Sequence, residues 1–147
     1  MAQALQLTEN VEMYLKYIYL LSQHNHGTAK TGEIAHYLKV APSSVTEMLE
    51  RLQKEKLIKY AKYQGATLTP KGKNVAVKIL RRHCTMEYFL VQLGVPEGRN
   101  HDEACEMEHV LSDDTTRRLQ KMVDWPGTCP DCYDLTKLHC SHLAAKR

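Results

Sequence analysis

The residues most able to do chemistry stand close together in the last third of the chain. Cys105, Glu108 and His109 are three and four residues apart, so a helix beginning near Asp102 would project all three side chains from one face. A thiolate, a carboxylate and an imidazole form a ligand set that suits Fe(II), Mn(II), Co(II), Ni(II) or Zn(II) better than Mg(II) or Ca(II). A buried cysteine beside a solvated ion pair would have the same spacing, so both interpretations stay open.

A second pair of possible ligands lies earlier in the chain. His83 and Glu87 are four residues apart on a long amphipathic helix predicted over residues 70–93 and ended by Gly94 and Pro96. This spacing places both side chains on one face, within reach of one ion. An ordinary surface hydrogen bond is the alternative. The length and apolar content of the helix favour a dimer interface.

A third group of possible ligands lies near the end of the chain. A C-x-x-C pair is followed by further donors at a spacing near that of structural zinc sites: Cys129, Cys132, Cys140 and His142, with His139 as the alternative histidine. The spacing predicts a Zn(II) or iron site in this tail. A redox-active pair, or cysteines without a role, are the alternatives.

Composition narrows the class of protein. The chain has 147 residues, of which 43% are hydrophobic and 25% charged, so it is expected to be globular. Its net charge of +3 is too small to establish a nucleic-acid partner by itself. No stretch approaches the roughly 18 apolar residues of a spanning helix, so we expect a cytoplasmic protein without a membrane partner. Five cysteines beside eight histidines favour metal or thiol chemistry over disulfides.

The first half of the chain is predicted to form a helix followed by a helix-turn-helix. Thr8 can cap the first helix, and Met13 falls outside its main apolar stripe. Thr31 is predicted to cap a short second helix over residues 32–38, and Pro42 suits the first position of the third. Two short helices joined by a tight turn are typical of DNA-binding proteins.

The opening of the third helix and a following hairpin are the predicted DNA contacts. Small or polar residues stand where a helix N-terminus would enter a major groove, and two short strands around Gly65 would form a wing. The residues expected to touch DNA are Thr31, Pro42, Ser43, Ser44, Thr46, Glu47, Lys62 and Tyr63. Lysines surround the wing at positions 54, 56, 59, 62, 71 and 73. A solvated lysine face is the alternative, but the neighbouring helix-turn-helix favours duplex phosphates.

The order of these features resembles the diphtheria-toxin-repressor family of iron- and manganese-dependent regulators, over about residues 8–119. The runs that carry the resemblance are VEMYLKYIY at 11–19, PSSVT at 42–46, LTPKG at 68–72 and, most specifically, HDEACEMEHVLSD at 101–113. The resemblance implies a mainly α protein in which a winged helix-turn-helix with a two-stranded wing precedes a helical metal-binding and dimerisation domain. The domains expected are 1–70 for DNA, 71–124 for metal and dimerisation, and 125–147 for the Cys/His tail.

The resemblance also implies the ligands. In the iron-responsive branch the regulatory ion would be held by Met13, Cys105, Glu108 and His109, and an ancillary ion by His83, Glu87 and His101. Manganese-responsive relatives carry carboxylates where Met13 and Cys105 stand and a glutamate where Lys16 stands. Sulfur donors therefore favour Fe(II), with Mn(II) as the alternative, although other divalent ions would bind as well in vitro. The family's further barrel domain is not represented in the pattern, so the ancillary site is expected to lack that domain's ligands.

The resemblance implies a homodimeric repressor of metal-homeostasis genes. It would bind double-stranded operator DNA when its metal is bound. It implies no enzymatic activity. A zinc hydrolase is a rival, because Cys, Glu and His also occur in catalytic sites, but no H-E-x-x-H pattern is present and the helix-turn-helix would have no role. A thiol-based redox regulator that responds through Cys105, or through Cys129 with Cys132, is a second rival. It predicts DNA binding that does not depend on metal.

Overall fold

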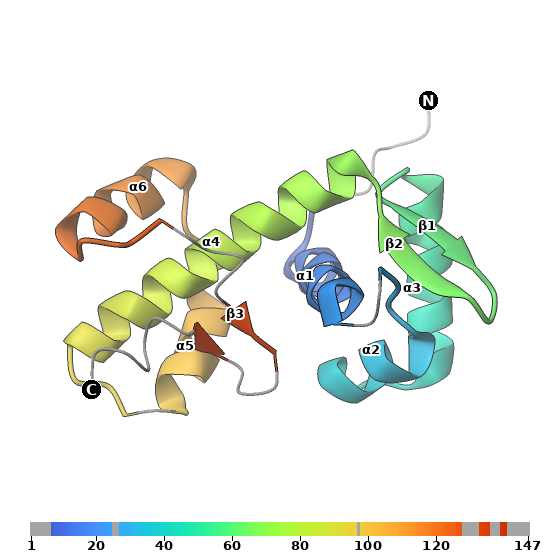
Figure 1. The fold of residues 1–147 in the computed structure, drawn as a ribbon, viewed down its shortest axis with the longest axis horizontal. Coiled ribbons are helices and arrows are strands. Elements are labelled where there is room, and N and C mark those ends of the chain that lie inside the picture. Colours follow the sequence, from blue (N-terminus) through green and yellow to red (C-terminus); the bar gives the residue numbers. More distant parts are fainter. Residues whose placement is uncertain (1–6, 25–26, 97, 128–132, 136–138, 141–147) are drawn as a thin grey trace. The chain divides into compact units, whose positions relative to one another are not determined.

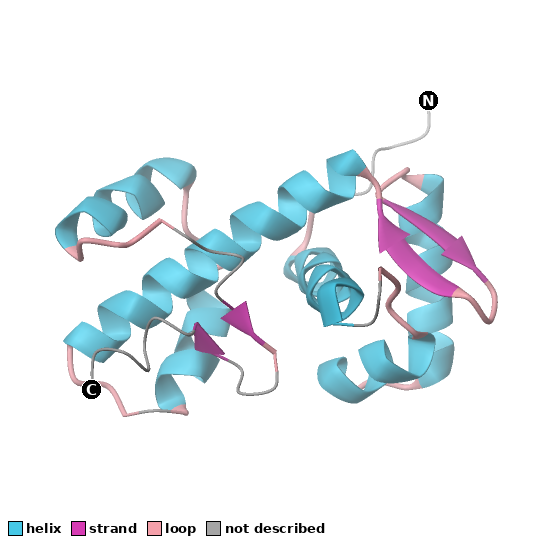
Figure 2. Ribbon diagram, viewed as in Figure 1, coloured by secondary structure: helices cyan, strands magenta, loops and turns pink. Residues whose placement is uncertain are grey.

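The computed structural model of the chain describes residues 7–24, 27–96, 98–127, 133–135 and, for the backbone, 139–140. Contacts divide the chain into two compact units, Met1–Ala76 and Val77–Arg147, each of which is described by itself. Helices dominate both units; a two-stranded antiparallel sheet follows the third helix, and a second, made of two-residue strands, lies in the second unit (Figure 1, Figure 2). The predicted mainly α fold with a two-stranded wing is confirmed.

The first unit contains the winged helix-turn-helix. Its elements are α1 (Glu9–His24), α2 (Thr31–Leu38), α3 (Pro42–Lys54), β1 (Ile58–Ala61), β2 (Gly65–Leu68) and the start of α4 (Pro70–Gln92). β1 and β2 pair in a register that joins Ile58 to Leu68 and Ala61 to Gly65. The predicted hairpin is therefore present, with Gly65 as the first residue of its second strand.

Helix α1 is the central helix of this unit. The Thr8 hydroxyl accepts a hydrogen bond from the Val11 amide at 3.3 Å, so the expected cap is present. The main apolar stripe is buried, and Tyr17 on another face is buried as well. Lys16 is fully buried, and its ammonium lies 5.5 Å from the centre of the Tyr17 ring. Met13 is only half-buried.

The start of α2 differs from the prediction by one residue. Thr31 is the first helical residue, and the N-cap is Lys30, whose backbone N–H donates to Glu33 Oε2 at 3.2 Å. The glutamate rather than a threonine hydroxyl therefore satisfies an otherwise unpaired donor. The turn after α2 depends on Lys39, which adopts a left-handed conformation at φ 56°. Helix α3 then begins at Pro42, as expected.

Two glycines allow close backbone packing around the wing. Gly65 has φ +102°, and a Cβ atom there would lie 2.7 Å from the Ala29 carbonyl oxygen. The backbone of Ala29 pairs with Ala66, which ties the loop before α2 to β2. A Cβ atom at Gly72 would lie only 2.0 Å from the Leu57 carbonyl oxygen. The first turn of α4 therefore packs directly on the chain that enters β1.

The second unit is built on the rest of α4. It also contains α5 (Arg99–Met107), α6 (Asp113–Met122), β3 (Tyr133–Asp134) and β4 (His139–Cys140). The expectation that α5 begins near Asp102 was wrong: the N-cap is Gly98, at φ 93°, and Asp102 lies in the first turn. Helix α6 was not predicted, although Ser112 caps it by accepting from the Thr115 amide at 3.1 Å.

Apolar contacts hold α5 and α6 to α4. One cluster joins Cys84 and Tyr88 to Val123, and the other joins Met86 and Leu90 to Ala104. Helix α4 therefore buries apolar side chains on several of its faces, because it has neighbours on more than one side. None of the helices within the described ranges is long and apolar enough to cross a membrane.

Candidate functional site

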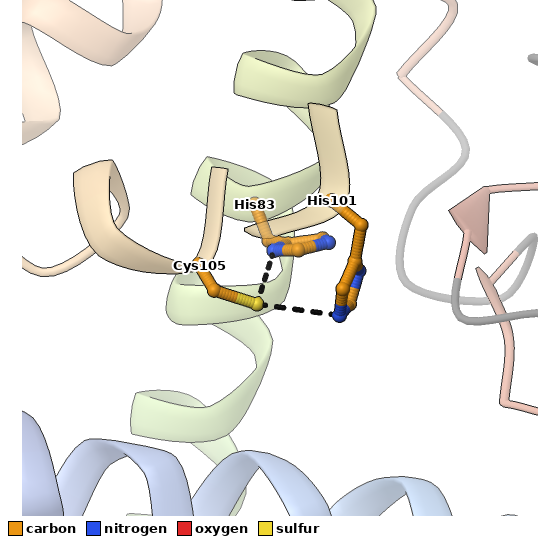
Figure 3. A group of neighbouring side chains, drawn as sticks. All are labelled: His83, His101 and Cys105. Carbon is orange, nitrogen blue, oxygen red and sulfur yellow. Dashed lines mark hydrogen bonds between the residues drawn. The ribbon is translucent and has the colours of Figure 1, made fainter. Parts of the chain in front are cut away.

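Helices α4 and α5 bring a group of possible metal ligands together. His83 and Glu87 are one turn apart on α4, and His101 and Cys105 are one turn apart on α5. Figure 3 shows His83, His101 and Cys105 pointing toward one another from these two helices. Glu108 joins them from the C-cap of α5. All five side chains belong to the second unit.

The sulfur of Cys105 lies between two imidazole nitrogens. Its distance is 3.7 Å to His83 Nδ1 and 3.5 Å to His101 Nε2. One donor atom from each of these three residues lies within 4.8 Å of the other two. Among the residues that the structure describes, this is the group of three or more His, Cys, Asp or Glu side chains with ligand atoms close enough to share one ion.

Glu87 connects the two histidines from the opposite side. Its Oε1 atom accepts a hydrogen bond from His83 Nε2 and lies 3.2 Å from His101 Nδ1. Both nitrogens are the ring atoms that face away from the sulfur. Glu87 and His83 are fully buried, so their charges depend on these contacts rather than on water. The carboxylate therefore fixes the orientation of both rings.

Glu108 links the same histidine to His109. Its Oε2 atom lies 2.6 Å from His83 Nδ1, and its Oε1 atom lies 3.2 Å from His109 Nε2. Glu108 is fully buried, and 3% of the His109 side chain is exposed. His83 thus lies between two buried carboxylates, each in contact with one of its ring nitrogens.

Hydrogen bonding in the cluster outweighs burial in setting two pKa values. Burial alone would raise the pKa of Glu87, but hydrogen bonds from His101 and His83 lower it to about 2. Burial alone would lower the pKa of His101, but its contacts with Cys105 and Glu87 raise it to about 9. In the absence of metal, hydrogen bonds between opposite charges in the cluster therefore offset the cost of burying Glu87 and His101.

Tyr133 is a neighbour of the cluster that the sequence did not indicate. Its ring centre lies 5.5 Å from that of His83 at an interplanar angle of 73°, and its hydroxyl lies 3.5 Å from His101 Nδ1. Tyr133 is in β3, after α6, and no spacing rule relates it to either histidine. A chain segment distant in sequence therefore contributes to the surroundings of the site.

The structure groups the predicted ligands differently from the two sets that the resemblance implies. The ancillary residues His83, Glu87 and His101 lie together, and Glu108 and His109 are in contact with each other. Cys105, expected in the other set, lies against the two ancillary histidines. The spacing of His101 and Cys105, four residues apart on one helix, was a signal for this pairing.

Two other parts of the ligand predictions are not tested by these contacts. Met13 is in α1, in the first unit. In the tail, Cys129, Cys132 and His142 lie outside the described residues, and only the backbone of Cys140, in β4, is described. Their roles as ligands stay predictions.

The exposed face of α3 carries the predicted DNA contacts. Pro42, Ser43, Ser44 and Glu47 are exposed, and Thr46 is half-buried with its hydroxyl donating to the Pro42 carbonyl at 3.2 Å. The opposite face is buried in the first unit and consists of Val45, Met48, Leu49 and Leu52. Thr31, at the start of α2, is half-buried. The first turn of α3 is therefore available to a partner.

The tip of the wing is basic and aromatic. Tyr63 is 89% exposed and adopts a left-handed conformation at φ 69°. The Lys62 ammonium lies 5.4 Å from the centre of its ring, within range of a cation–π interaction. Lys59 on β1 and Lys71 and Lys73 on α4 are also exposed. Such a surface suits a phosphate backbone.

Two family models match the chain. The N-terminal DNA-binding domain of iron-dependent repressors matches residues 6–66, and the metal-binding and dimerisation domain of the same repressors matches residues 69–134. The two matches together cover most of the sequence. They assign operator DNA and a second copy of the chain as partners.

Individual relatives are also DNA-binding transcriptional regulators by name. An uncharacterised HTH-type transcriptional regulator of Methanocaldococcus jannaschii is 42% identical over 115 residues, which are 78% of this chain and 92% of the relative. The HTH-type transcriptional regulator MntR of Lysinibacillus sphaericus is 39% identical over 84% of this chain and 88% of its own length.

Among solved structures, the manganese regulator SloR has a TM-score of 0.71 at 35% identity. The match covers 84% of this chain and 58% of SloR, so the chain spans somewhat over half of that protein. The chain therefore belongs to the iron-dependent-repressor family, the diphtheria-toxin-repressor family of the sequence resemblance, and is a metal-dependent, DNA-binding transcriptional repressor.

Proposed function

We propose that this repressor is activated by Fe(II) and controls genes of metal homeostasis from the cytoplasm. The observation that supports Fe(II) is the position of the Cys105 sulfur, 3.5 Å and 3.7 Å from two imidazole nitrogens. A donor set that includes this thiolate is softer than the oxygen-rich ligands that suit Mn(II). Mn(II) is the second candidate, because relatives are named MntR and a solved neighbour is titled a manganese regulator.

The proposed regulatory ligands are Met13, Cys105, Glu108 and His109, and the proposed ancillary ligands are His83, Glu87 and His101. A bound ion would supply positive charge where buried carboxylates and a thiolate meet. Because Met13 belongs to the DNA-reading unit and the other donors to the second unit, an ion bound to both would favour one arrangement of the two. An ion can shift the population only by binding that arrangement more tightly.

The proposed DNA contacts are the first turn of α3 and the wing. Ser43, Ser44, Thr46 and Glu47 would face base edges from the helix N-terminus, with Pro42 and Thr31 beside them. Lys62 and Tyr63 would contact the backbone from the wing. The exposure of the α3 side chains and of the wing tip supports this division of roles.

Binding of operator DNA under controlled metal tests the proposal. An operator is first selected from random duplexes by the full chain with Fe(II) under anaerobic conditions. Binding is then measured with Fe(II), with Mn(II) and with chelator, for the parent and for Met13→Ala, Cys105→Ala and His109→Ala. We expect binding only with metal, tightest with Fe(II), and lost or weakened in each variant.

Matched controls separate ligand loss from general damage. Met122→Ala removes an exposed methionine of α6, Cys84→Ala a buried cysteine of α4, and His24→Ala an exposed histidine of α1. Each control should keep the metal dependence of the parent. Equal binding by the parent with metal and with chelator would reject the proposal, and dependence on thiol oxidation alone would favour the redox regulator. Tighter activation by Mn(II) would replace Fe(II) with Mn(II).

The tail is proposed to hold Zn(II) through Cys129, Cys132, Cys140 and His142, on spacing alone. This proposal is separate from the regulatory metal. Zinc content of the purified full chain, compared with that of a variant with all three tail cysteines changed to serine, tests it.

A further inference from the structure

A pocket between α4 and α6 is lined mainly by positive charge. It has a volume of about 370 Å³ and lies in the second unit, where α6 packs along α4 (Figure 1). Its lining residues are Lys78, Arg81 and Arg82 from α4 and Asp113, Thr116, Arg117 and Gln120 from α6. Among the described residues, four cations and one carboxylate therefore line this pocket, and no proposed metal ligand does.

Helical spacing brings these side chains to the facing sides of the two helices. On α4, Lys78 precedes the two arginines by three and four residues, and on α6 the lining residues follow Asp113 at intervals of three, four and seven. Two contacts hold the helices together: Gln120 Nε2 donates to Thr85 Oγ1 at 3.1 Å, and Val123 packs against α4. The shape of the pocket is therefore set by packing within the second unit.

Arg82 is the least exposed cation of the pocket. Only 18% of its side chain is exposed, and its Nη2 atom donates to Asp113 Oδ1 at 2.7 Å. Its Nε atom is buried and has no hydrogen-bond partner within the part of the chain that the structure describes. Buried donors in proteins are usually paired, because an unpaired donor has lost its hydrogen bonds to water. This donor therefore suits an acceptor atom of a ligand that enters the pocket.

The ion pairs already present leave the pocket with an excess of positive charge. Asp113 is shared by Arg82 and by Lys78, whose ammonium lies 3.9 Å from the carboxylate. Arg117 lies 3.8 Å from Asp114, a carboxylate that is next to the lining residues and also pairs with another arginine. The lining itself carries four positive charges and one negative charge, an excess of three. An anion is therefore the kind of ligand that fits this pocket.

Arginine chemistry and the pocket volume indicate the class of anion. A guanidinium can donate two parallel hydrogen bonds to a phosphate, which is why arginine recurs in phosphate sites. A volume of about 370 Å³ is in the range of small-molecule sites and exceeds what one phosphate fills. Two phosphoryl groups carry a charge of about −3 at neutral pH, which matches the excess. The buried position of Arg82 Nε favours a small molecule that enters the pocket over a phosphate of duplex DNA.

We propose that the pocket formed by Lys78, Arg81, Arg82 and Arg117 binds a small anion with a diphosphate group, such as pyrophosphate or a nucleoside diphosphate. Arg82 donates to the anion from Nε, while Asp113 holds the end of the same guanidinium. Because the anion contacts both α4 and α6, its binding stabilises the second unit. This inference goes beyond the proposed function and does not depend on which metal activates the repressor.

Titration calorimetry of the full chain with pyrophosphate, adenosine diphosphate and inorganic phosphate tests the site. Metal is removed first and the chelator is then dialysed away, because diphosphates bind divalent ions and chelators are themselves polyanions. Chloride is the anion of the buffer. We expect one pyrophosphate per chain, bound at least about 10-fold more tightly than inorganic phosphate, because the second phosphoryl group adds charge-assisted hydrogen bonds. Pyrophosphate should also raise the temperature of thermal unfolding.

Neutral variants of similar size locate the site. Arg82→Gln and Arg117→Gln should each weaken pyrophosphate binding about 10-fold or more, because each loses a charge-assisted hydrogen bond. Arg118→Gln is the matched control: it removes the same charge from the neighbouring position of α6, and Arg118 is not a lining residue. Its affinity should equal that of the parent. Circular dichroism checks folding, and the Arg117 side chain is 69% exposed, so its loss should not disturb packing.

Several results would overturn the proposal. These are no binding of either diphosphate, equal affinity for pyrophosphate and inorganic phosphate, no loss in Arg82→Gln, or equal losses in Arg117→Gln and Arg118→Gln, which would mean that binding follows net charge alone. The affinity of the same variants for random duplex DNA is also measured. If Arg117→Gln weakened DNA binding and lowered its salt dependence, the pocket would be a contact for the DNA backbone and the proposal would fail.

Discussion

The metal cluster and the DNA-reading surface differ in the burial of their polar side chains. In the cluster, titratable side chains such as His83, Glu87 and Glu108 are fully buried, and each has a hydrogen-bond partner. On the reading surface, Ser43, Ser44 and the wing tip are exposed, and the packing that holds them lies on the opposite face of α3.

This difference determines how each region should respond to substitution. A buried network loses stability when one member is removed, because the remaining buried groups are left with fewer partners. An exposed reading surface can lose its side chains with little effect on folding, so its variants report on DNA alone. The following predictions test this contrast in order of decreasing expected effect.

The largest effect is expected for His83→Ala in the metal-free protein. The substitution leaves Glu87 and Glu108 buried without the histidine between them, and breaking such a buried pair costs about 3–5 kcal/mol. Denaturant unfolding of the second unit in the presence of chelator measures it. The control, His24→Ala, removes an exposed histidine and should change stability by less than about 0.5 kcal/mol. A loss below about 1 kcal/mol for His83→Ala would mean that the network is not stabilising.

Gly72→Ala should cause the next largest loss of stability, and this loss should affect the DNA-reading unit. The new Cβ atom would lie 2.0 Å from the Leu57 carbonyl oxygen, so either α4 or the chain entering β1 must move. Such overpacking costs about 1–3 kcal/mol, and this contact is close enough to place the loss near the upper value. Thermal unfolding measures the loss.

Gly32→Ala is the matched control for Gly72→Ala. A Cβ atom at Gly32, in α2, would meet nothing within 4 Å. Alanine is the better helix former, so this variant should gain about 0.5–1 kcal/mol. Equal losses in the two variants would contradict the packing of α4 on Leu57.

The serines of α3 should control sequence preference without affecting folding. Ser43→Ala and Ser44→Ala should each cost about 1–3 kcal/mol on the selected operator and much less on random DNA, if they read base edges. Unfolding free energies should stay within about 0.5 kcal/mol of the parent value. Equal losses on operator and random DNA would show that these serines contact only the backbone.

Lys62→Ala should have a smaller and less selective effect. A phosphate contact contributes equally on all sequences, so affinity should fall for operator and random DNA alike, and the slope of log affinity against log salt should decrease by about 1. Binding isotherms at several salt concentrations measure this. Lys121→Ala, in α6 of the second unit, is the control, and its salt slope should equal that of the parent. A slope unchanged in Lys62→Ala would remove the wing tip from the DNA contacts.

The smallest effect is expected at the exposed ion pair of the second unit. Arg82 donates to Asp113 at 2.7 Å, and this hydrogen bond lowers the pKa of Asp113. Because the folded state has the lower pKa, the pair stabilises the protein above the unfolded-state pKa of about 4, and this contribution is lost as pH falls through the folded value.

Asp113→Asn should therefore be less stable than the parent at pH 7, and the difference should vanish at acidic pH. Asp113 is 53% exposed, so the loss should not exceed about 1 kcal/mol. Unfolding free energies of both proteins as a function of pH measure it. Asp102→Asn, in the first turn of α5, controls for the helix dipole. A difference that grew as pH fell would reverse the assigned sign.

Sequence spacing predicted the first unit well because most of its signals are local. Pro42 starts α3 and Gly65 stands in the wing, where a residue's own backbone preference decides the structure. The errors were also local: the cap of α2 is made by the Lys30 backbone with Glu33, and α5 starts at Gly98. These two errors shifted only an element boundary, whereas helix α6 of the second unit was missed altogether.

The ligand grouping was less predictable, because it depends on contacts between helices. Helical spacing placed Cys105, Glu108 and His109 on one turn and His83 with Glu87 on another. It could not show that α5 presents His101 and Cys105 to His83, or that Tyr133 lies beside both histidines. His83 is 18 residues from His101 and 22 from Cys105, and Tyr133 is 32 residues from His101, so no periodicity connects them.

The amino-acid sequence by itself determined which chemistry is available: donors for a transition metal on two helices, and a helix-turn-helix with a basic wing. Backbone preference and helical periodicity act over a few residues, so they fix elements and the faces of those elements. Only the tertiary structure decided which faces meet, because burial of α4 against α5 selects the partners of each charged group. The contact of the Cys105 thiol with two histidines and the sharing of Glu87 between them follow from that packing.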